Sequence, residues 1–112
     1  MPDILDYKQI LSDSVAFTRK EVGSSWSKIK PYADHEFTQF AENAFFLARL
    51  KLTGVIEADE LKSRLQMQKL AMQNVLLAIK GVGIVTAQNV VNGVLDIVSG
   101  AIKKAINIIL PV

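Results

Sequence analysis

Apolar residues recur at steps of three and four along most of this chain, which is the spacing of one buried face of an α-helix. The first such segment covers residues 3–22, with Asp3 as its expected cap and Gly23 as its stop. A second covers residues 31–53, because proline is tolerated in the first turn of a helix but not in its interior. Its broad apolar face predicts a helix buried on much of its circumference.

A third helix is expected over residues 58–80, after a connection of about four residues. So short a connection predicts an antiparallel hairpin that brings Phe45 and Phe46 near Leu65, Met67 or Met72. The third segment carries two apolar stripes rather than one. The first comprises Leu61, Leu65, Met72, Val75, Leu76 and Ile79, and the second comprises Met67, Leu70 and Leu77. Two stripes indicate contact on two sides of this helix.

Residues 84–110 pose a choice between strand and helix. The segment is rich in Val and Ile, and Asn92-Gly93 is a typical hairpin-turn pair. However, its apolar residues do not alternate with polar ones. They recur in pairs with a period near 3.5, so we predict a helix. Residues 81–83, Gly-Val-Gly, then form either a turn that folds this helix back or a hinge between two helices that run on together.

The predicted C-terminal helix has an apolar face broader than a two-stranded coiled coil requires. Its heptad core positions are Ile84, Val91, Val98 and Ala105, together with Ala87, Val94, Ala101 and Ile108. We therefore predict that this helix is the assembly element. Its predicted interaction residues are Ile84, Val91, Val94, Val98, Ile102 and Ile108. The alternative is that the other helices of the same chain bury the whole face.

Composition agrees with one small domain over residues 1–112. Half of the residues are hydrophobic and 21% are charged, which excludes a disordered chain. The mean hydropathy of +0.26 is high for a small soluble domain and points to apolar surface buried against a partner. The chain has no cysteine, and its start lacks the apolar core of a secretory signal. We expect a cytoplasmic protein.

Candidate chemistry is sparse. His35 is the single histidine, and the positions three and four residues away hold Pro31, Tyr32, Thr38 and Gln39, so this helix offers no metal site. No phosphate-binding glycine motif is present. We predict no catalytic, cofactor or metal site and no enzymatic activity. Lys28 and Lys30 interleave with Trp26 and Tyr32, but four residues do not make a nucleic-acid interface, and we expect no nucleic-acid partner.

Residues 81–102 are long enough to cross a bilayer, but Asp96 near their centre would cost about 2.5–3.5 kcal/mol. We therefore expect no transmembrane span. The sequence predicts an all-α protein, an antiparallel helical bundle of three to four helices with a long apolar C-terminal helix. The predicted function is non-enzymatic: self-association, or docking of a helical protein partner, through that helix. The alternative is a peripheral protein that binds a lipid or granule surface. The polar face of residues 88–107 has more Asn, Gln, Ser and Asp than Lys and Arg, which favours a protein partner.

Overall fold

The computed structural model describes residues 5–111, and these residues form helices and connections without a β-strand. The all-α prediction is confirmed. The helices are α1 (Tyr7–Val22), α2 (Trp26–Leu52), α3 (Ala58–Leu77) and α4 (Ile84–Ile106), with a short 3₁₀ turn, η1 (Gly23–Ser25), between α1 and α2.

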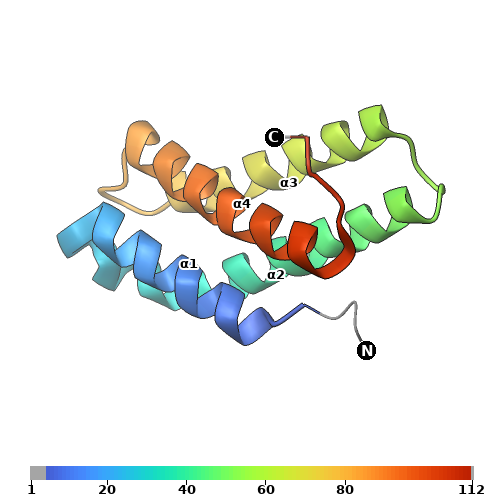
Figure 1. Ribbon diagram of the computed structural model, residues 1–112. Coiled ribbons are helices and arrows are strands. Elements are labelled where there is room, and N and C mark those ends of the chain that lie inside the picture. The colour runs from blue at the N-terminus through green and yellow to red at the C-terminus, as the bar shows by residue number, and fades with distance from the viewer. Residues whose placement is uncertain (1–4, 112) are drawn as a thin grey trace.

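Each helix runs antiparallel to the one before it along the chain (Figure 1). α1 packs against α2 and α4, and α3 packs against the same two helices. α2 and α4 also touch across the centre, whereas α1 and α3 make no contact within residues 5–111. The side formed by α1 and α4 is therefore opposite the side formed by α2 and α3.

The cap of α1 is Asp6, whose side chain accepts a hydrogen bond from the Gln9 backbone N–H at 3.1 Å. An N-terminal cap of this kind satisfies one of the helix's free N–H groups. The Asp3 cap expected from the sequence lies outside the described residues. The helix ends at Gly23, whose φ of +57° is a conformation that L side chains rarely adopt.

α2 begins at Trp26, five residues before the start predicted at Pro31, so that prediction is wrong. Ile29 and Ala33 on either side of the proline are buried in the core, and their burial favours the extra turn. Pro31 itself is exposed. Its missing N–H leaves the Ser27 carbonyl, four residues earlier, without the usual helical donor.

The α2–α3 connection turns at Gly54, where φ is +78°. Thr53 closes α2 because both its backbone N–H and its hydroxyl donate to the Arg49 carbonyl at 3.0 Å. α2 and α3 then pack along their length as the short connection predicts. The predicted proximity is confirmed for one pair, since Phe46 and Met67 line the same surface hollow.

The Gly81–Gly83 segment is a turn and not a hinge. Gly81 takes a φ of +94°, and α4 folds back against α3. Gly93 lies inside α4, so the helix prediction is confirmed there over the hairpin signal. α3 ends at Leu77, before the predicted Lys80. α4 ends at Ile106, because Asn107 adopts the left-handed conformation; the prediction that the helix continues to residue 110 is therefore wrong.

The core lies where the inner faces of all four helices meet. Its largest apolar side chains with relative exposure below 2% are Phe37, Ile29, Leu61, Leu76, Ile102, Val90, Val91, Val94 and Val98. On α4, these side chains include Val91, Val94, Val98 and Ile102, which recur at steps of three and four and therefore share one helix face. α4 is thus the central element of the fold.

Candidate functional site

The predicted assembly face of α4 is largely occupied by this chain's own core. Val91, Val94, Val98 and Ile102 each have a relative exposure of 0%. Ile108 is partly buried just beyond the helix, and Ile84 is 56% exposed at the first turn. The breadth of the face is explained by three neighbours, because α1, α2 and α3 all pack against α4. Of the six residues, Ile84 alone offers most of its surface to a partner.

Large exposed apolar side chains instead gather on α2 and α3. Phe46 on α2 is 62% exposed, and Met67 and Leu70 on α3 are 68% and 52% exposed. Phe46 and Met67 line one hollow of about 250 Å³, and Leu70 follows Met67 by three residues on the same side of α3. We call these three residues the α2–α3 surface. Such side chains are enriched at protein interfaces.

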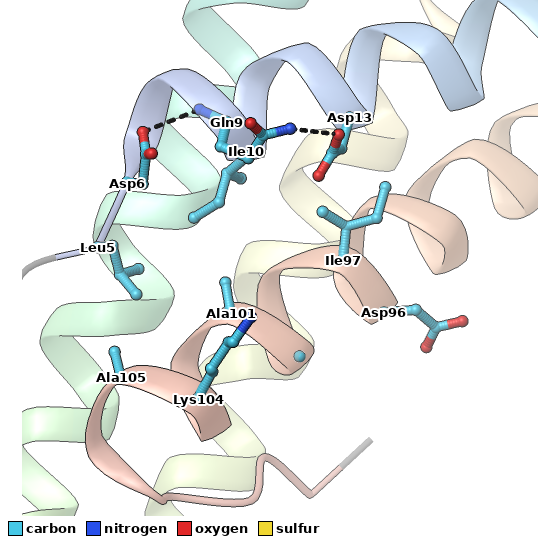
Figure 2. Close-up of a pocket in the computed structure, with 11 residues that line it drawn as sticks. Leu5, Asp6, Gln9, Ile10, Asp13, Asp96, Ile97, Ala101, Lys104 and Ala105 are labelled. Atoms are coloured by element: carbon cyan, nitrogen blue, oxygen red, sulfur yellow. Dashed lines mark hydrogen bonds between the residues drawn. The ribbon is translucent and has the colours of Figure 1, made fainter.

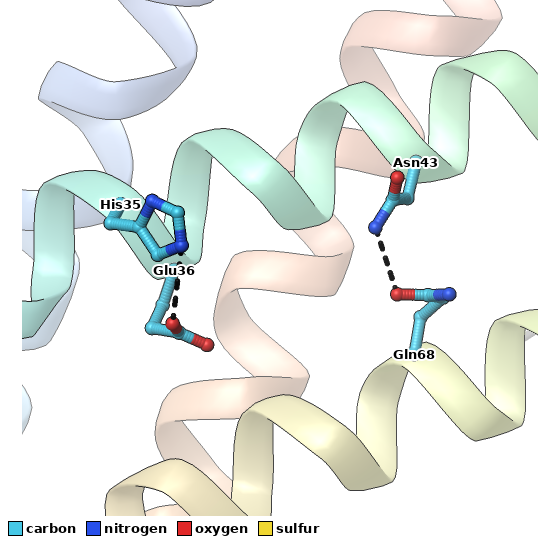
Figure 3. Close-up of polar contacts among 4 residues, drawn as sticks. All are labelled: His35, Glu36, Asn43 and Gln68. Atoms are coloured by element: carbon cyan, nitrogen blue, oxygen red, sulfur yellow. Dashed lines mark hydrogen bonds and ion pairs between the residues drawn. The ribbon is translucent and has the colours of Figure 1, made fainter.

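A side-chain hydrogen bond marks the inner edge of the α2–α3 surface. The Asn43 Nδ2 group of α2 donates to the Gln68 Oε1 atom of α3 at 3.0 Å (Figure 3). These two amides line the hollow beside Phe46 and also a smaller one of about 110 Å³ further along the same helix pair. The bond holds α2 and α3 at a set spacing, so the exposed side chains stand on a braced pair of helices.

The sequence contained a signal for this surface. Met67 and Leu70 belong to the second apolar stripe of the third helix, which indicated contact on a second side. Within residues 5–111 both of these side chains remain more than half exposed, whereas Leu77, the third member of the stripe, is partly buried against the core. Phe46 lay beside the main apolar face of the second helix and was not distinguished from core residues by its spacing.

A second hollow, of about 570 Å³, lies between α1 and α4 (Figure 2). Its floor is apolar and includes Ile10 and Ile97. Its rim carries the carboxylates of Asp6, Asp13 and Asp96 and the ammonium group of Lys104. Asp6 is engaged in capping α1, and Asp13 accepts a hydrogen bond from the Gln9 side chain at 2.8 Å. Two of the three carboxylates thus already have partners in α1.

The remaining polar side chains do not assemble into a reactive group. His35 is exposed, and its Nε2 atom lies 3.9 Å from Glu36 Oε2, which is too long for a hydrogen bond (Figure 3). In residues 5–111, no three His, Cys, Asp or Glu side chains lie close enough together to hold a metal ion. The hydroxyls of Ser14 and Thr18 are buried and, in the described part of the chain, make no hydrogen bond, so they act as small packing residues of α1.

None of the four helices, as far as the structure describes them, is long and apolar enough to cross a membrane. Comparison of the chain with protein-family models, curated proteins and solved structures gives no significant match. The exposed surfaces of the chain therefore carry the functional evidence, beginning with the three large apolar side chains of the α2–α3 surface.

Proposed function

We propose that this chain is a non-enzymatic interaction protein, an antiparallel helical bundle that self-associates through the α2–α3 surface. One observation carries the proposal. Phe46, Met67 and Leu70 are large apolar side chains, each more than half exposed, and they are neighbours on two helices that are braced by a hydrogen bond. Apolar side chains clustered in this way on a small protein are typical of an interaction site.

A second copy of the chain is the partner that these residues favour. The charged pair on this part of α3 is internally neutral, because Arg64 Nε lies 2.8 Å from Glu60 Oε2. The amides of Asn43 and Gln68 are already bonded to each other. A two-fold contact would therefore bury the apolar side chains of both copies without breaking either of these pairs. An anionic lipid surface would instead favour a rim rich in lysine and arginine.

The helix that mediates association is thus α3, with Phe46 of α2, rather than α4. The physical reason is burial. Val91, Val94 and Val98 already contact the rest of the chain, and exposing them to a partner would require the core to open. Phe46, Met67 and Leu70 need no such opening, since their exposure costs the monomer hydrophobic stabilisation that a partner would recover.

The test is the solution mass of wild type and of a double variant, Met67→Glu with Leu70→Glu, measured by sedimentation velocity over a range of concentrations. We expect wild type to form a dimer with rising concentration and the double variant to remain monomeric with an unchanged helical circular dichroism spectrum. Val55→Glu is the matched control, because Val55 is as exposed as Met67, at 68%, but lies in the α2–α3 connection. The control should dimerise like wild type.

Two results would contradict the proposal. A wild-type chain that is monomeric at high micromolar concentration does not self-associate. A Val55 variant that loses association as fully as the double variant would show that any exposed apolar residue suffices, and the α2–α3 surface would then have no special role.

A further inference from the structure

One end of the helix assembly combines strong positive charge with exposed aliphatic side chains. Both the α1–α2 and the α3–α4 connections lie at this end (Figure 1). They are adjacent, because a Cβ atom built on Gly81 would lie 2.9 Å from the Nζ atom of Lys28. We call residues 19–32 together with residues 78–85 the basic end.

The net charge of the basic end differs in sign from that of the rest of the chain. Its basic residues are Arg19, Lys20, Lys28, Lys30 and Lys80, and its one acidic residue is Glu21. These residues sum to +4, whereas the whole chain carries +2, so all other residues together carry −2. The five basic residues are all exposed. The nearest acid further along α2, Asp34, lies beyond Tyr32. A field of this sign attracts an anionic partner.

Ile84 and Val85 stand among these charges at the first turn of α4. They are 56% and 65% exposed, and Tyr32 on α2 is 48% exposed. The glycines on either side of Val82 give the connection no bulky side chains that would shield them. Aliphatic side chains surrounded by lysines suit the boundary between lipid headgroups and acyl chains. There the aliphatic side chains enter the apolar layer and the lysines contact the lipid phosphates.

We propose that the basic end docks on an anionic lipid bilayer. Ile84 and Val85 enter the headgroup–acyl boundary, while Lys20, Lys28 and Lys80 contact lipid phosphates. The helices then stand on the membrane by their ends, with no segment crossing it. Because two aliphatic side chains enter, binding is reversible and depends on the anionic charge of the lipid, so it weakens as salt screens that charge.

Nucleic acid is a poorer fit to the same residues. Single-strand binding needs aromatic rings free to stack on bases. At the basic end Tyr32 is the one largely exposed ring, because Trp26 is only partly exposed and the Arg19 guanidinium lies 5.9 Å from the Trp26 ring centre. The exposed pair, Ile84 and Val85, would gain nothing from a phosphate backbone.

This docking is separate from the proposed self-association. On α2, Phe46 lies fourteen residues after Tyr32, and on α3, Leu70 lies eight residues before Ala78; at 1.5 Å per residue these separations are about 21 Å and about 12 Å. A dimer formed at the α2–α3 surface therefore leaves the basic end free. Failure of either activity would not imply failure of the other.

The test is cosedimentation of the full chain with vesicles of phosphatidylcholine alone and of phosphatidylcholine mixed with phosphatidylserine. We expect binding to the mixed vesicles at low salt and little binding to the neutral ones. Lys20→Glu with Lys80→Glu should weaken binding at least about tenfold. Lys103→Glu with Lys104→Glu is the matched control, with the same charge change in the last turn of α4 at the opposite end, and it should lose much less.

Ile84→Ser with Val85→Ser tests the aliphatic contribution without changing charge. Both side chains are exposed, so the fold should persist, which circular dichroism checks, and we expect weaker binding even at low salt. The Met67→Glu, Leu70→Glu variant should bind vesicles like wild type. Absence of wild-type binding to the mixed vesicles overturns the proposal. Equal losses for the two lysine pairs overturn the assigned location. Tighter binding to single-stranded DNA, unaffected by the serine substitutions, would identify nucleic acid as the partner instead.

Discussion

Gly93 of α4 lies directly against the Phe17 ring of α1, and this contact gives a sharp energetic prediction. A Cβ atom added there would lie 2.0 Å from Cε2 and 2.1 Å from Cζ of the Phe17 ring. Ordinary carbon–carbon contact needs about 3.5–4.0 Å, so the ring would have to retreat by about 1.5 Å or more. Overpacking of this kind costs about 1–3 kcal/mol. We therefore expect Gly93→Ala to disrupt the contact between α1 and α4.

Gly100 provides the control within the same helix. A Cβ atom added at Gly100 would meet no heavy atom within 4 Å. Both substitutions gain the helix propensity of alanine over glycine, which is about 0.8–1.0 kcal/mol. This gain cancels in the comparison, so the free energies of unfolding of the two variants should differ by the overpacking cost, about 1–3 kcal/mol. Gly100→Ala should be more stable than wild type.

The assay is urea denaturation followed by circular dichroism. With a urea dependence of about 1–3 kcal/mol per molar for a small protein, the two midpoints should be separated by roughly 1 M. In a Phe17→Ala background the ring is absent, and Gly93→Ala should then stabilise as Gly100→Ala does. Equal midpoints for Gly93→Ala and Gly100→Ala in the wild-type background would refute the packing of Phe17 on Gly93.

Three further outcomes follow from burial. Val94→Asp places a carboxylate at a fully buried position and should abolish cooperative unfolding, whereas Asn92→Asp on the exposed side of α4 should not. If Val94→Asp instead gives a folded species of lower mass than wild type, α4 would be the assembly element. Ser14→Ala removes a buried hydroxyl that has no hydrogen-bond partner in the described residues, and a urea midpoint that fails to rise by the equivalent of about 1 kcal/mol would count against that assignment. Burial first, and then the charge of Glu42, raise the pKa of Tyr7 above 10.0. Tyrosine therefore ionises sooner in the unfolded chain, and stability should fall as pH rises past 10 and less so in Tyr7→Phe, which denaturation at several alkaline pH values would show.

The helix boundaries show which features the local spacing of apolar residues predicts and which it does not. The spacing of apolar residues predicted a helix over 84–110 despite the Asn92-Gly93 signal, because a period near 3.5 persisted over many turns, and residues 84–106 of that segment are helical. The start of α2 was missed, because the proline rule concerns local backbone bonding and takes no account of the burial of Ile29. Burial in the assembled core stabilises one extra turn against the cost of a missing hydrogen bond.

The location of the candidate site could not be predicted from the spacing of apolar residues. Periodicity identified both the broad apolar face of α4 and the second stripe of α3. It does not distinguish an apolar face that is buried by other helices from one that is exposed to solvent. Which of the two is bare depends on how many neighbours each helix has. α4 contacts three helices, whereas α3 contacts two and leaves Met67 and Leu70 without cover.

The sequence by itself determined that the chain is helical, where α4 begins and that α2 and α3 form a hairpin, because these follow from short-range spacing and a short connection. Only the tertiary structure decided which apolar side chains remain at the surface and that the basic residues of two separate connections meet at one end. Burial and charge density depend on residues distant in the chain coming together. Lys28 and Gly81 are fifty-three positions apart yet adjacent in space, and no periodicity along the chain encodes that contact.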